Sequence, residues 1–75
     1  MMQLAPRVVV DDKVQAGKPV IEGTRVPVEV ILGVLAAGES IEQVMTEYRL
    51  EREDVLAAIA YAATIVSGEE VRQVG

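Results

Sequence analysis

The sequence predicts an α+β fold that is mostly α, with short β-strand or hairpin elements followed by a three-helix, helix-turn-helix-like bundle. Two observations support this: β-branched and turn-forming residues dominate 7–26, and apolar residues recur with helical spacing after Pro27. The length of 75 residues, 51% of them hydrophobic, leaves room for one small core. We therefore expect a single domain, with β elements or an arm at about 7–26, helices at 27–67 and a tail at 68–75.

The first expected element is a strand at Arg7–Val10, because three consecutive valines favour strands and the aspartates at 11–12 end them. A stretch rich in glycine and proline follows. Within it, the short runs Val20–Ile21 and Thr24–Val26 lie on either side of a turn. Two arrangements stay open for these runs: a tight hairpin, in which Gly23 supplies the positive φ, or an extended arm.

A first helix should begin near Pro27, since a proline fits the first helical turn, where its missing N–H is not needed. Apolar residues at the spacing i, i+3, i+4, i+7 run from Val28 to Leu35 and predict its core-facing stripe. Gly38 stands where a left-handed C-cap is expected.

Two further helices follow. Ser40 and Gln43 have the spacing of a capping box, and the apolar residues of 41–48 repeat the helical pattern. Acidic residues within 51–54 favour the first turn of a third helix, because the helix macrodipole attracts negative charge there. This helix should run to about Ser67, and two arrangements stay open for the tail from Gly68: frayed chain or an extension of the helix.

The third helix has two apolar rows, and one domain of this size cannot cover both. The row expected to face the core comprises Val55, Ile59, Ala62 and Val66. The other row is either tolerated in solvent, because alanine is a good helix former, or buried in a dimer or partner interface. The candidate partner interface, with Arg72 added as a possible tail contact, comprises Ala58, Tyr61, Ile65 and Arg72.

Composition excludes several chemistries. Cysteine and histidine are both absent, which removes disulfides, Cys/His zinc sites, thiolate nucleophiles and imidazole acid–base catalysis. We therefore expect neither an enzyme nor a metal or cofactor site. Without a secretory signal or an apolar run near 20 residues, the chain is expected to be cytoplasmic and to have no membrane partner.

A net charge of −5 argues against non-specific binding to nucleic acid, which depends on lysine and arginine. Residues 1–26, however, hold four basic against three acidic residues, whereas 39–54 holds two against six. Contacts with phosphate are therefore to be sought in the N-terminal third. The candidate DNA contacts are Arg7, Lys18 and Arg25.

One stretch makes the chain recognisable: a Gly-Lys-Pro at 17–19 is followed by a Gly-Thr-Arg at 23–25. From about Val8 to Ala62 the sequence resembles the prokaryotic family catalogued as domain of unknown function 433, whose members look like VapB-type antitoxins of type II toxin–antitoxin pairs. It departs from the family pattern at Ala16, where glycine is usual, and at Glu22, where a basic residue is common. The motif residues expected to be structural or contacting are Gly17, Pro19, Gly23, Thr24 and Pro27.

The resemblance implies a short β element, a helix-turn-helix-like bundle that is often dimeric, and a PIN-like ribonuclease toxin as partner. The expected function is thus an antitoxin that binds and neutralises this toxin, with Tyr61 as an apolar anchor. The alternatives are a dimeric DNA-binding regulator, which could control its own operon, and a general protein-interaction module. The expected partners are the toxin, operator DNA and a second copy of the chain in a homodimer or higher oligomer.

Overall fold

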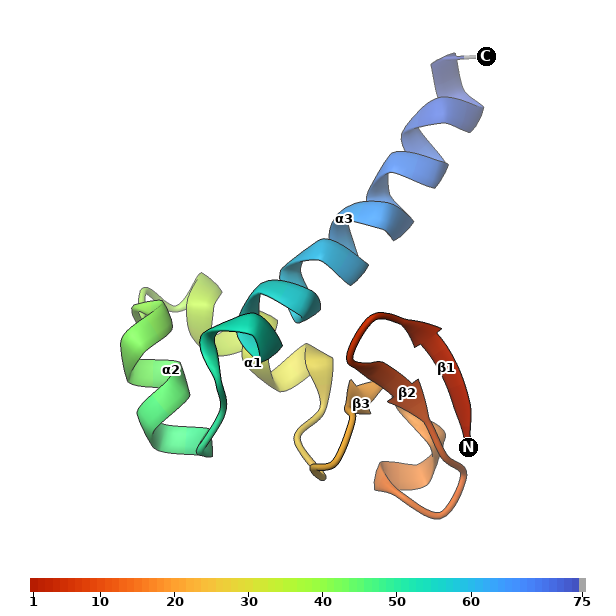
Figure 1. Cartoon of the computed structure of the whole chain (residues 1–75). Coiled ribbons are helices and arrows are strands. Elements are labelled where there is room, and N and C mark those ends of the chain that lie inside the picture. The colour runs from red at the N-terminus through yellow and green to blue at the C-terminus, as the bar shows by residue number, and fades with distance from the viewer. Residues whose placement is uncertain (75) are drawn as a thin grey trace.

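The computed structural model describes residues 1–74, with side-chain surroundings described through Gly68. Three antiparallel strands precede three helices, which confirms the predicted α+β class (Figure 1). The elements are β1 (Met2–Ala5), β2 (Val8–Val10), the 3₁₀ turn η1 (Gln15–Gly17), β3 (Val20–Ile21), α1 (Val28–Ala36), α2 (Ile41–Tyr48) and α3 (Arg52–Val74).

The valine strand β2 is the centre of the sheet. It pairs with β3 through Val8 opposite Ile21 and Val9 opposite Val20, and all four side chains are buried. Since side chains alternate across a strand, the two pairs lie on opposite faces. Val8 and Ile21 belong to the main core, whereas Val9 and Val20 are buried on the other face of the sheet. Both faces of β2 are therefore covered, as expected for a run of valines.

Strand β1 was not predicted. It forms an antiparallel hairpin with β2, with an irregularity between Gln3 and Ala5. Arg7 was predicted to start the strand, but it lies in the turn of this hairpin with a positive φ of 64°. The turn at Gly23 was predicted correctly, with a φ of 81°. The residues on either side of this turn form neither the tight hairpin nor the extended arm in full. Strand β3 pairs with β2, and it meets the chain that returns from the turn at one bridge, between Val20 and Pro27.

The helix ends follow the local sequence signals. Pro27 is the N-cap residue of α1. Beyond the other end of α1, Gly38 has a φ of 104°, and its N–H donates to the Leu35 carbonyl while the Glu39 N–H donates to that of Val34. These two bonds form a Schellman motif. The predicted capping box at the start of α2 is present in both directions.

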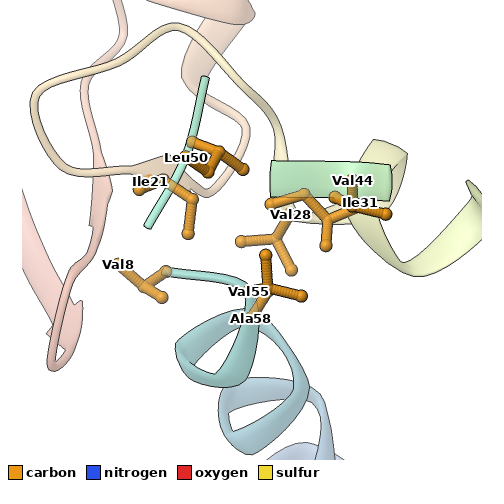
Figure 2. Packing of buried hydrophobic residues seen from close by; sticks show 8 residues of the cluster. All are labelled: Val8, Ile21, Val28, Ile31, Val44, Leu50, Val55 and Ala58. Atoms are coloured by element: carbon orange, nitrogen blue, oxygen red, sulfur yellow. The ribbon is translucent and has the colours of Figure 1, made fainter. Parts of the chain in front are cut away.

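A single cluster of aliphatic side chains joins the sheet to the three helices. Figure 2 shows these side chains converging from β2, β3, the three helices and the α2–α3 connection. None of its buried members is aromatic, and Tyr48 and Tyr61 pack against it from the outside. Its buried members are Val8, Ile21, Val28, Ile31, Val44, Leu50, Val55 and Ala58.

Helix α3 takes the longer of the two lengths left open by the sequence, and it differs from the prediction in the face that it turns to the core. It continues past Ser67 to Val74 and projects beyond the rest of the molecule (Figure 1). Val55 faces the core as expected, but Ile59 and Val66 are 39% and 60% exposed. Ala58, assigned to the outer row, is fully buried instead. The inner face of α3 therefore passes through Val55 and Ala58, and the predicted core row was largely wrong.

Candidate functional site

The most unusual surface of the molecule is the projecting part of α3. From Val55 to Gly68 this helix has no charged residue. Beyond Ala62 its residues are exposed as far as Gly68, including Ile65 at 49% and Val66 at 60%. Uncharged apolar surface of this extent, on one continuous element, is typical of an interaction site in a soluble protein.

At its base the helix forms one wall of an apolar groove, which we call the α1–α3 groove. Its volume is about 300 Å³, at the lower limit for ligand pockets and enough for one or two large side chains of a partner. An ion pair between Lys18 and Glu29, 2.6 Å apart, lies at its rim. The groove is lined by Lys18, Pro19, Val28, Glu29, Leu32, Tyr61, Ala62 and Ile65.

The predicted partner interface is only partly available on this surface. Tyr61 and Ile65 both line the α1–α3 groove, Tyr61 half-buried and Ile65 exposed. Ala58 is fully buried in the core and cannot contact a partner, so this part of the prediction is wrong. The side chain of Arg72 lies outside the described residues. Leu32 was missed as a groove residue, because its place in the apolar stripe of α1 indicated a core position.

Arg7 has a structural partner rather than a free position for DNA. Its guanidinium Nη1 lies 2.9 Å from Glu51 Oε1 and 2.8 Å from Asp54 Oδ1. These hydrogen bonds, led by the one to Glu51, raise the pKa of Arg7. The Asp54 carboxylate also accepts from the backbone N–H of Glu51 at the start of α3. Arg7 thus ties the β1–β2 turn to the first turn of α3.

The other two candidate DNA contacts differ from each other. Lys18 is partly neutralised by its ion pair with Glu29, which also removes Glu29 as a partner for Arg25. Arg25 is exposed and, within the described part of the chain, its guanidinium makes no ion pair. Its backbone carbonyl accepts a hydrogen bond from Gln15 Nε2 at 3.1 Å. The structure therefore leaves Arg25 as the least neutralised of the three cations.

The glycines and prolines of the motif shape the junction between β3 and α1. Gly17 and Gly23 have positive φ angles, of 80° and 81°. The Pro19 carbonyl accepts the N–H of Val28, and Pro27 caps the same helix. These contacts give the motif residues a structural role.

Thr24 fixes the turn that follows β3. Its hydroxyl donates to the Ile21 carbonyl at 2.8 Å and accepts from the Val26 N–H at 3.0 Å. The side chain thereby replaces strand pairing on this side of the turn. This explains why the run 24–26 is not a strand.

The outer side of α2 is acidic. Glu42 and Glu47 are exposed there, and Glu42 forms an ion pair with Arg52 of α3. Burial, followed by a hydrogen bond to Glu47, raises the pKa of Tyr48.

Among the described residues no cluster of three or more acidic, histidine or cysteine side chains could hold a metal ion. None of the described helices has both the length and the apolar character needed to cross a membrane.

The ion pair of Glu42 predicts part of the acid sensitivity of the fold. A hydrogen bond to its own backbone, and then the bond from Arg52, lower the pKa of Glu42 below its ordinary 4.5. A lowered folded-state pKa stabilises the protein above the ordinary value, and this contribution is lost as pH falls through the lowered one. In Glu42→Gln, the free energy of unfolding should therefore fall less steeply with acid below pH 4.5 than in the wild type, as measured by urea titrations at several pH values. Identical slopes for the two proteins would contradict this assignment.

Comparison with known proteins agrees with the fold. One solved structure, the X-ray crystal structure of Rv2018 from Mycobacterium tuberculosis, matches 69% of this chain with 33% identity and a TM-score of 0.64. The match covers 24% of that protein, so this chain corresponds to about a quarter of its length. No curated protein is significantly similar. Residues 8–62 match the model of the family described as "Protein of unknown function (DUF433)", and the chain therefore belongs to that family.

Proposed function

We propose that this protein is a non-enzymatic, antitoxin-type protein that binds and neutralises a PIN-like ribonuclease toxin. The observation that supports this best is the uncharged, exposed part of α3 beside the α1–α3 groove. Exposed apolar surface gains free energy when a partner covers it, about 25 cal/mol for each Å² buried. In this proposal the toxin inserts apolar side chains into the groove, where Tyr61 and Ile65 contact them.

Charge is consistent with this partner. A ribonuclease binds RNA through basic surface, and residues 39–54 have a net charge of −4, from six acidic and two basic residues. Exposed carboxylates on α2 can steer such a basic protein into an encounter and favour it over acidic competitors. The groove would then provide the buried contacts, and the acidic surface would raise the rate of association.

The DNA-binding alternative has less support. Two of its three candidate contacts, Arg7 and Lys18, form ion pairs with carboxylates of the same chain. To neutralise phosphates, each would first have to leave its partner. Arg25 alone does not supply the several phosphate contacts that a DNA site needs.

Co-expression of the protein with the product of the adjacent gene tests the proposal. We expect the two proteins to purify together and the ribonuclease activity of the partner to be lost in the complex. Failure to co-purify, or co-purification with undiminished ribonuclease activity, would contradict it. In that case, a band shift with the promoter DNA of the gene that weakens steeply with salt would favour the regulator instead.

A further inference from the structure

The rim of the α1–α3 groove holds a basic side chain of the same molecule. Lys18 Nζ lies 2.6 Å from Glu29 Oε1, and both residues line the groove together with apolar side chains. The methylene stem of a lysine packs readily along apolar surface while its ammonium stays at the edge. The free protein therefore displays the kind of group that this surface accepts, which is a cation on an aliphatic stem, paired with a carboxylate.

The two members of this pair differ in how firmly they are held. Glu29 belongs to the first turn of α1, where the helix dipole favours a carboxylate. Lys18 lies in the loop between η1 and β3, and its ammonium ends a long, flexible stem. The side chains of Lys18 and Glu29 are 56% and 60% exposed, so water screens the pair and its opening costs little. Glu29 is thus the fixed member, and Lys18 is the exchangeable one.

We infer that the α1–α3 groove is a binding site for a basic side chain of a partner, whose stem lies between α1 and α3 and whose cation replaces Lys18 on Glu29. Arginine is the side chain that fits this site best. As an account of how the toxin is recognised, the inference rests on the proposed function. As a property of the groove, it stands without the toxin.

An arginine gains more on Glu29 than Lys18 loses. A guanidinium donates two parallel hydrogen bonds to one carboxylate, whereas an ammonium acts as a point charge. A guanidinium also stacks on aromatic rings, and Tyr61 is the aromatic residue of the groove lining. Leu32 and Ile65 provide aliphatic surface for the stem. With a volume of about 300 Å³, the groove holds this side chain beside an apolar neighbour from the partner.

Charge selects a cation rather than an anion for this site. Among the described residues that line the groove, the charged ones are Lys18 and Glu29, and α3 has no charged residue from Val55 to Gly68. An incoming carboxylate would pair with Lys18 but would meet Glu29, and like charges side by side are unfavourable. An incoming cation displaces only a side chain that is free to leave. The net charge of −5 also attracts cations from a distance.

Titration of the isotope-labelled protein with hexylguanidinium, followed by NMR, tests the groove without any toxin. We expect saturable shifts of the backbone amides of Leu32, Tyr61 and Ile65. Hexanol has the same chain without a charge, and hexanoate has a negative charge on a similar chain. Hexylguanidinium should bind about fivefold more tightly than hexanol, the gain expected from one exposed ion pair, and hexanoate should bind more weakly than either.

Two variants assign the charges. Glu29→Gln should reduce the affinity for hexylguanidinium to that for hexanol, because the carboxylate is lost. Lys18→Gln should raise it, because the internal competitor is lost. Glu47→Gln is the control, since it removes the same charge from an exposed position on α2, outside the groove. It should leave the ratio of the two affinities unchanged.

The same variants act on the complex in opposite directions. With the toxin of the co-expression experiment, Glu29→Gln should weaken binding about fivefold, and Lys18→Gln should strengthen it or leave it unchanged. Failure to capture a toxin would contradict the proposed function alone, because the titration decides the chemistry of the groove. Equal affinities for the three probes, or no saturable shift with any of them, would overturn the inference. A preference for hexanoate, or weaker binding of hexylguanidinium by Lys18→Gln, would overturn it as well.

Discussion

Replacing Ile31 with alanine is expected to remove most of the free energy that stabilises the fold. Ile31 is fully buried where α1 faces the common core (Figure 2). Such a truncation removes buried area and leaves a cavity, at a cost of about 2–5 kcal/mol. A single core of this size rarely supplies more than about 3–5 kcal/mol in total. Thermal and urea unfolding followed by circular dichroism should show a broad transition, or none, for Ile31→Ala.

Ile65→Ala makes the matched control. It is the same chemical change on α3, but Ile65 is 49% exposed. Because much of this side chain is already in water, its truncation should cost less than about 1.5 kcal/mol. Both variants are to be measured at the same protein concentration as the wild type, so that any effect of association on stability is equal in all three. Equal losses for the two variants would mean that Ile31 is not central to the core.

The features predicted correctly are those decided by neighbouring residues. The capping box of Ser40 and Gln43 needs residues three apart, and the turn of Gly38 needs only a glycine after a helix. The turn at Gly23 belongs to the same class. In each case, the local conformation satisfies its own backbone groups, so the distant fold does not change the outcome.

The features that were missed depend on contacts between distant parts of the chain. No acidic residue close to Arg7 in the sequence indicates that it is paired. Only the fold brings it to Asp54, 47 residues away. Strand β1 forms because β2 offers it an edge. The two apolar rows of α3 are similar in composition, and the packing of α1, α2 and β2 against the helix decides which of them is inside. Small Ala58 fits that close approach, whereas the larger Ile59 is left outside.

Replacing Ile65 with lysine is expected to weaken binding of the proposed toxin about 30-fold or more. Ile65 lines the α1–α3 groove with Tyr61 and Leu32. In the free protein the lysine can extend into water, so the fold should be retained. In the complex its ammonium would be buried among apolar groups without a partner, which carries a large desolvation cost. Loss of a central interface contact typically costs at least about 2 kcal/mol, which corresponds to about 30-fold in affinity.

Thr64→Lys separates this effect from the charge alone. It adds the same charge to the neighbouring residue, whose hydroxyl bonds only to the Ala60 carbonyl of its own helix. We expect Thr64→Lys to inhibit the ribonuclease like the wild type, and Ile65→Lys to require far higher concentrations for the same inhibition. Equal weakening by both variants would indicate that the toxin responds to the charge of α3 rather than to the groove. Normal inhibition by both would place the toxin contact on another surface.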